Sequence, residues 1–336
     1  MTQRRGFRWS VLLLFVFAVL VAAYFLLFTR RSPETYQIYY VGKTNPAGIE
    51  FWRTAQAGME AAARERHVEL TCLAPEDESQ TAENLAIFEQ TVARKPDAIL
   101  FSASLYREMS EPVAEAVRGG QKVVMLDSGV RAVEGAEPVS QIRTDNTDAG
   151  RKIATLMKED VTRDKRVLII SHSVGTDSAD ERRRGVLDVL MRAGFQGIRT
   201  LDAEGRAASI RDRLYPLLRT QQIDVLVALN EYTTEATART LQEAGLASKI
   251  PLYGIDCSRN LIPFLEDGTL AATVVQRPFN MGYLAIDAAV DAIEGRAVPK
   301  EIWVGTQCIR KEDIYLPENQ KLLFPFQDEG VRSSTP

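Results

Sequence analysis

The sequence predicts an α/β protein with two parallel β-sheets, preceded by one transmembrane helix. Three observations support this prediction. Short apolar runs alternate with amphipathic stretches along most of the chain. The chain is long enough for two lobes of about 150 residues each. Residues 10–28 form an apolar run without a single charge. Continuous apolar strands separated by helices are typical of parallel sheets that are covered on both faces.

The apolar run at residues 10–28 reads SVLLLFVFAVLVAAYFLLF. At 1.5 Å per residue it reaches roughly 28 Å, close to the ~30 Å hydrocarbon core of a bilayer. Ala22 and Ala23 are followed by Tyr24 rather than by a good cleavage site, so we expect an uncleaved signal anchor. The alternative is a cleaved signal peptide. With an anchor, the protein is a single-pass bacterial cell-membrane protein whose ectodomain is extracytoplasmic, periplasmic or extracellular.

Charge and cysteine content restrict the chemistry of the ectodomain. Five arginines and no acid precede residue 32, which leaves 36 basic against 45 acidic side chains and a net charge of −9 for residues 32–336. This balance argues against binding to nucleic acid. Cys72, Cys257 and Cys308 are an odd number at wide spacing and indicate neither a disulfide framework nor a metal cluster. We expect no metal and no cofactor.

The chain after the membrane segment divides into regular elements. Strands are expected at 36–41, 68–73, 97–102, 122–127, 166–171, 198–203, 223–229, 250–256 and 270–275. Helices are expected at 51–66, 79–94, 147–160, 180–193, 231–245 and 279–295. A cytoplasmic N-terminus at 1–9, a connector at 29–35 and a polar tail at 318–336 complete the organisation.

Polar side chains follow the predicted strands, where ligands of open parallel sheets bind. Two carboxylates, two amides, one guanidinium and two aromatic rings make up the set: Asp127, Asp256, Asn230, Gln276, Arg182, Phe51 and Trp52. The apolar faces of a small polyhydroxylated ring stack on aromatic rings, and its hydroxyls bridge acceptors and donors. The set contains no proton shuttle, so we expect a binding protein and no catalytic residue.

Seven segments in order resemble the type I periplasmic binding proteins, specifically the ribose-binding-like subgroup, over about residues 36–316. They are FWRTAQAGME, VVMLDS, IRTDNTDAG, GTDSADERRRG, LVALNE, LYGIDC and LAATVVQRP. The resemblance implies two Rossmann-like lobes joined by three hinge crossings. One lobe would comprise residues 36–145 with 277–305, and the other 146–276 with 306–317.

The same resemblance implies roles for the pocket residues. Phe51 and Trp52 would stack on the sugar ring, while Asp127 and Asp256 would accept hydrogen bonds from hydroxyls. Arg182 would donate hydrogen bonds to the sugar. Asn230 and Gln276 would both donate and accept hydrogen bonds.

Several positions depart from the ribose-binder pattern. Ser128 stands where ribose binders carry Arg, Ala103 stands where they carry Asn, and the first loop, GKTNPAGIE, is about two residues longer. We therefore add Lys43, Asn45, Ala103 and Ser128 as further candidates for the site. The ligand is then a pentose, a hexose or a related polyol.

Each candidate also has a purely structural interpretation. Phe51 and Trp52 could pack in the core, and Asp127, Asp256 and Asn230 could cap helices. His67 and His172 are isolated and are expected to be surface or core histidines.

Three functions are consistent with these residues. The first is a receptor that presents its closed form to an ABC importer. The second is a sugar-sensing subunit of a membrane histidine kinase or chemoreceptor. A glycosidase-like enzyme using Asp127 and Asp256 is the distant third, because two carboxylates also bind hydroxyls without chemistry.

Overall fold

The computed structural model describes residues 35–324, together with Phe17 and Val19. Apart from those two residues, the predicted membrane anchor at 10–28 lies outside the described part of the chain. The predicted N-terminus at 1–9, nearly all of the connector and the end of the tail lie outside it as well. Among the residues that are described, no helix is long and apolar enough to cross a membrane.

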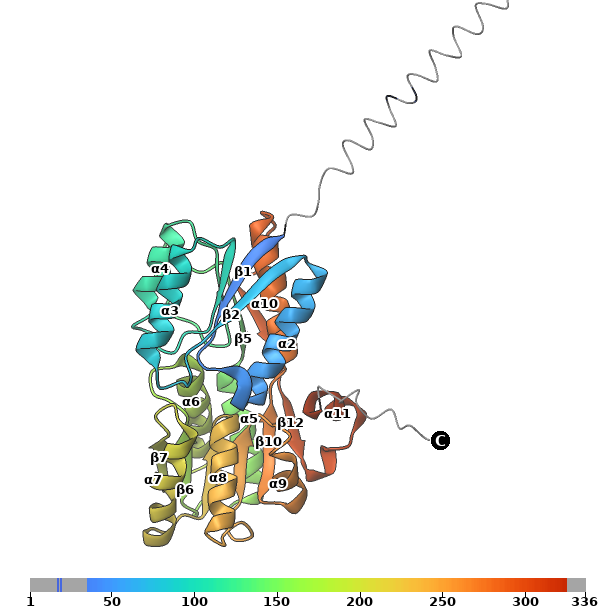
Figure 1. Cartoon of the computed structure of the whole chain (residues 1–336). Helices are drawn as coiled ribbons and strands as arrows, with labels where there is room; N and C mark the ends of the chain where they lie inside the picture. Colours follow the sequence, from blue (N-terminus) through green and yellow to red (C-terminus); the bar gives the residue numbers. More distant parts are fainter. Residues whose placement is uncertain (1–16, 18, 20–34, 325–336) are drawn as a thin grey trace, which may run out of the picture. The chain divides into compact units, whose positions relative to one another are not determined.

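The first sheet has six strands in the order β2-β1-β3-β4-β5-β11. The strands are β1 (Tyr36–Val41), β2 (Val68–Leu73), β3 (Ala98–Phe101), β4 (Val123–Leu126), β5 (Ser140–Thr144) and β11 (Glu301–Val304). Strand β1 pairs in parallel with β3, β3 with β4, β4 with β5, and β5 with β11. Four α-helices accompany this sheet: α2 (Glu50–Glu65), α3 (Thr81–Ala93), α4 (Ser110–Arg118) and α10 (Pro278–Ile293). Figure 1 shows β1 and β2 of this sheet between helices α3 and α4 on one side and α2 and α10 on the other.

The second sheet repeats the arrangement in the order β7-β6-β8-β9-β10-β12. Its strands are β6 (Val167–Ser171), β7 (Ile198–Asp202), β8 (Val225–Ala228), β9 (Leu252–Ile255), β10 (Leu270–Val275) and β12 (Gln307–Arg310). Its helices are α5 (Asn146–Asp160), α6 (Asp177–Arg192), α7 (Ala207–Thr220), α8 (Glu231–Glu243) and α9 (Ile262–Asp267). Apolar side chains of α5 and α6 pack on one face, and those of α7 and α8 pack on the other.

The chain passes between the two sheets three times. It leaves the first sheet after β5, returns after β10, and leaves again between β11 and β12. The lobe boundaries that we predicted, 36–145 with 277–305 and 146–276 with 306–317, stay a prediction, and the strands of each sheet fall inside them.

The structure adds elements that the sequence pattern did not predict. Strands β5, β11 and β12 are short and carry polar residues, so they lack the apolar run that marks the other strands. Strand β12 pairs antiparallel with β10, so the second sheet is mixed rather than purely parallel. Part of the predicted tail forms α11 (Pro317–Leu323), because Asn319 and Leu323 are buried against the second lobe.

The register of the strands brings their carboxyl ends together. In the first sheet Val41 lies opposite Phe101, and Phe101 lies opposite Met125. In the second sheet Ala228 lies opposite Ile170 and Gly254 in the same way. Residues that immediately follow these strands therefore share one edge in each sheet.

Each lobe contains a pair of helices that touch through glycine. A Cβ atom added at Gly150 of α5 would lie 2.1 Å from the carbonyl oxygen of Arg182, and one at Gly185 of α6 would lie 2.1 Å from that of Thr147. Helices α2 and α10 meet in the same way at Gly58 and Gly282. No side chain fits such an approach, so these crossings fix the positions of α2 and α6, which carry site residues.

We predict that Gly185→Ala lowers the free energy of unfolding by about 2–3 kcal/mol, because α5 and α6 must separate. Alanine is otherwise the better helix former by about 1 kcal/mol, so a loss would be due to the crossing. The matched control is Gly305→Ala, where an added Cβ meets nothing within 4 Å. Urea unfolding of both variants measures the difference, and equal stabilities would contradict this prediction.

Candidate functional site: a pocket between the two lobes

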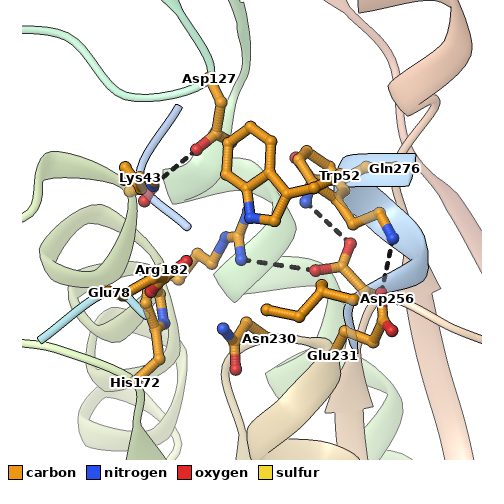
Figure 2. A pocket seen from close by; sticks show the side chains of 13 residues that line it. Lys43, Trp52, Glu78, Asp127, His172, Arg182, Asn230, Glu231, Asp256 and Gln276 are labelled. Carbon is orange, nitrogen blue, oxygen red and sulfur yellow. Dashed lines mark hydrogen bonds and ion pairs between the residues drawn. The ribbon is translucent and has the colours of Figure 1, made fainter. Parts of the chain in front are cut away.

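The described part of the chain forms a pocket where the strand ends of the two sheets face each other (Figure 2). All seven residues that we predicted for the site line it: Phe51, Trp52, Asp127, Arg182, Asn230, Asp256 and Gln276. Side chains fill most of the pocket and leave a cavity of about 20 Å³. A cavity of that size admits about one water molecule, so a larger ligand requires the lobes or the side chains to move.

Lys43 and Asp127 form the ion pair of the first lobe. The Lys43 ammonium donates to the Asp127 carboxylate at 2.8 Å and to the Ser128 hydroxyl at 2.7 Å, and both charged side chains are buried. Burial favours the neutral acid, yet Lys43, Arg182 and these hydrogen bonds hold the pKa of Asp127 below its ordinary value. Lys43 thus belongs to the pocket, and Asp127 stays ionised.

The other further candidates do not line the pocket. Ser128 lies behind Asp127, where its hydroxyl accepts from Lys43. Ala103 is fully buried in the core of the first lobe. Asn45 is exposed and caps the short 3₁₀ helix η1 (Pro46–Gly48), and its carboxamide oxygen accepts from the Ala47 N–H.

Arg182 and Asp256 form the corresponding pair of the second lobe. The Arg182 guanidinium lies 3.7 Å from the Asp256 carboxylate and donates to Asn146 and to the Leu229 carbonyl, at 2.8 Å each. Gln276 donates to the other oxygen of Asp256 at 2.8 Å. Burial raises the pKa of Asp256, and Arg182 and Gln276 only partly oppose it. The buried Arg182 is therefore fixed in one orientation.

Asp127 and Asp256 occupy equivalent positions in the two lobes. Each follows the fourth strand of its lobe along the chain, and each has a left-handed backbone, with φ of 64° and 71°. Non-glycine residues adopt this conformation at a cost of about 1–3 kcal/mol each. Strain of this kind, repeated at two buried carboxylates of one pocket, is typical of a binding site.

The aromatic pair and Asn230 have more specific positions than we predicted. Phe51 and Trp52 are buried and meet edge to face, with ring centroids 4.8 Å apart at 88°. The carboxamide oxygen of Asn230 accepts from the Thr233 N–H and caps α8. Asn230 thus combines both of the interpretations above: its oxygen caps the helix, and its side chain lines the pocket.

Three titratable residues that we did not select also line the pocket, together with Ile49 and Ser178: Glu78, His172 and Glu231. His172 is buried, and burial together with Arg182 and Lys43 holds its pKa well below its ordinary value. It is therefore a core histidine, one of the two alternatives that we expected, and it lines the pocket. The only sequence signal for these residues is their position directly after, or a few residues after, a strand.

Glu231 joins the two lobes. Its carboxylate accepts hydrogen bonds from the backbone N–H groups of Glu50 and Phe51, at 2.8 and 2.7 Å. Helix α2 has no side-chain cap of its own, so Glu231 of the second lobe caps the helix of the first. In return, the Glu50 carboxylate accepts from the Arg259 N–H of the second lobe at 2.9 Å.

A second set of contacts joins the lobes on the other side of the pocket. The Asp177 carboxylate of α6 accepts from the Gly129 N–H at 3.0 Å, and the Ser128 and Ser178 hydroxyls lie 3.1 Å apart. Burial raises the pKa of Asp177 to about 6, while Arg143 opposes the rise. Polar contacts between the lobes therefore enclose the pocket from two sides.

Comparison with known proteins identifies the class of protein that this fold and pocket define. Residues 28–297 match the model of the periplasmic binding protein domain. The chain therefore belongs to this family, as its resemblance to ribose-binding-like proteins predicted.

The chain is similar to curated sugar-binding proteins over most of its length. It is 24% identical to the D-allose-binding periplasmic protein of Escherichia coli, over 74% of this chain and 83% of that protein. It is 23% identical to the ribose import binding protein of Haemophilus influenzae, over 77% of this chain and 87% of that protein. These relatives are named as binding proteins rather than as enzymes.

Solved structures have the same fold. A carbohydrate transporter solute-binding protein from Agrobacterium radiobacter, in complex with D-arabinose, has a TM-score of 0.77 at 26% identity, over 87% of this chain and 100% of that one. An ABC transporter solute-binding protein from Agrobacterium vitis, with bound D-fucose, has a TM-score of 0.79 at 27% identity. The match covers 85% of this chain and 99% of that one.

We predict that the contact made by Glu231 depends on pH. Burial raises the pKa of Glu231 from 4.5 to about 8. The two backbone N–H groups lower this pKa, and the nearby carboxylates of Asp256 and Glu50 raise it. The folded state thus binds this proton more tightly than the unfolded state. The contribution of Glu231 to the free energy of unfolding should fall as pH rises from 4.5 through 8.

Urea unfolding between pH 5 and pH 9 tests this prediction. Glu231→Gln should flatten the decline of stability across this range. The control, Glu235→Gln, removes a carboxylate of the same helix that pairs with Arg239 at the surface, and it should keep the wild-type slope. A wild-type slope in Glu231→Gln would contradict the assignment.

Proposed function

We propose that this protein is an extracytoplasmic receptor that binds a small sugar, a pentose, hexose or related polyol, between two closing lobes. The observation that supports it most is the composition of the pocket, in which buried aromatic rings face ionised and amide side chains from both lobes. The relatives named above bind ribose, allose, arabinose or fucose, which supports the same class of ligand.

The proposed mechanism is closure of the lobes on the ligand. Phe51, Trp52 and Asp127 belong to the first lobe, and Arg182 and Asp256 belong to the second. A ligand that binds both sides has a higher affinity for the closed form, and only this difference shifts the population toward closure. The pocket performs no chemical step in this proposal.

We propose that the closed form is presented to an ABC importer. The relatives whose names mention import or transport support this partner. The alternative partner is a membrane histidine kinase or chemoreceptor, which the apolar run at 10–28 favours, because an anchor and a short connector hold the receptor close to the bilayer. Sugar-dependent co-purification from native membranes distinguishes them: a permease with its ATPase supports import, and a kinase or chemoreceptor supports sensing.

We further propose that residues 10–28 anchor the protein in the cell membrane. The length and the lack of charge of this run support the proposal. An anchored protein stays in the membrane pellet after carbonate washing and keeps Met1 or Thr2 as its N-terminus. A soluble form that begins after Ala23 would contradict it.

A thermal-shift screen of the full-length protein tests the proposed function. The panel comprises pentoses, hexoses, deoxy sugars and polyols. A ligand at 100-fold excess over its dissociation constant adds about 2.7 kcal/mol of stability, which moves the melting temperature measurably. If no member of the panel shifted the melting temperature, sugar binding as proposed here would be wrong.

We predict that Asp256→Ala and Arg182→Ala each weaken binding by about 2–4 kcal/mol, because each leaves buried polar partners unpaired. Arg183→Ala is the matched control, since the neighbouring Arg183 pairs with Asp180 outside the pocket. Isothermal titration with the sugar found in the screen measures the effects. Loss of binding in Arg183→Ala, with Arg182→Ala unaffected, would contradict the assignment.

A further inference from the structure

The pocket holds more carboxylates than cations. Two cations and four carboxylates line it: Lys43, Arg182, Glu78, Asp127, Glu231 and Asp256. Most of these carboxylates already have strong partners. Asp127 pairs with Lys43, Asp256 pairs with Arg182, and Glu231 accepts two backbone N–H groups.

Glu78 is the pocket carboxylate for which the described residues supply neither a direct ion pair nor a backbone N–H donor. It lies in the loop after β2, in the sequence APEDES, and reaches the pocket from the first lobe (Figure 2). The neutral indole of Trp52 is its hydrogen-bonding neighbour. Burial raises the pKa of Glu78, while Lys43 and Arg182 oppose the rise from a distance. A nearby cation would stabilise this carboxylate in its ionised form.

A second observation shows that the pocket requires hydrogen-bond donors. Gln276 is 1% exposed, and its carboxamide oxygen has no hydrogen-bond partner among the described residues, because its NH₂ group already donates to Asp256. An amide oxygen can only accept. A buried polar atom of this kind costs about 1–3 kcal/mol unless a partner reaches it.

A protonated amine has the required chemistry. An ammonium group offers three donors and no acceptor, and its hydrogen bonds to a carboxylate are about twice as strong as neutral ones. The faces of the Phe51 and Trp52 rings also attract both cations and the apolar face of a sugar ring. A neutral sugar would satisfy the hydroxyl partners but would bring no cation to Glu78, whose raised pKa favours the neutral acid until a positive charge approaches.

We infer that the ligand of this pocket is an amino sugar or amino polyol whose protonated amine binds Glu78. The inference rests on the proposed function, since it specifies the ligand class of the same pocket. Glu78 is the specificity-determining residue, and the residues that hold the hydroxyls are those described above.

Isothermal titration of the full-length protein at pH 7 tests this inference with matched sugars. The probes are D-glucosamine, D-galactosamine and D-mannosamine, each compared with its neutral parent and its N-acetyl derivative, together with D-ribose, D-allose and D-arabinose. We expect at least one amine to bind about tenfold or more tightly than its parent and its N-acetyl form. A neutral sugar that binds as tightly as every amine would overturn the inference and leave the proposed function intact. No binding by any amine would also overturn the inference, whereas the proposed function is decided by the wider thermal-shift panel.

Glu78→Gln separates the role of the charge from that of the fold. We expect it to remove the preference for the amine over its neutral parent, a loss of about tenfold in the ratio of the two affinities. The matched control is Glu76→Gln, two residues away on the surface of the same loop, which should keep the preference. An unchanged preference in Glu78→Gln would show that another group recognises the amine and that the assignment is wrong.

Discussion

The contact on which the rest of the site depends is the cap that Glu231 places on helix α2 of the other lobe. The first N–H groups of a helix need acceptors, and the residue before α2, Ile49, supplies none from its side chain. The Glu231 carboxylate accepts from two of these groups. Since Phe51 and Trp52 lie in this first turn, the cap fixes the aromatic rings relative to the carboxylates and amides of the second lobe.

Four charged groups of the pocket form two ion pairs, Lys43 with Asp127 and Arg182 with Asp256. Isolated buried charges are costly, whereas paired and hydrogen-bonded ones are tolerated. The left-handed backbone at Asp127 and Asp256 directs both carboxylates into the same space. Each carboxylate meets a cation of its own lobe, so neither of these two ion pairs is a contact between the lobes.

Much of the fold could be predicted because the central strands are continuous apolar runs. Asp127, Asp256, Asn230 and Gln276 could be selected because residues after parallel strands share one edge. Strands β5, β11 and β12 were missed because they are short and partly polar. Glu231 was missed for a different reason: its partners, Glu50 and Phe51, lie far away in the sequence, and no local pattern marks a carboxylate that acts across two lobes. Glu78 was missed because it lies within a loop, several residues beyond the end of β2.

The central claim, that the ligand holds both lobes together, is tested most directly by hydrogen–deuterium exchange of the full-length protein. The informative N–H groups are those of Glu50, Phe51 and Gly129 in the first lobe and Arg259 in the second, all bonded to carboxylates of the opposite lobe. We expect saturating ligand to slow exchange at all of them together. Slowing confined to one lobe, or no change at these groups when ligand is bound, would contradict the claim.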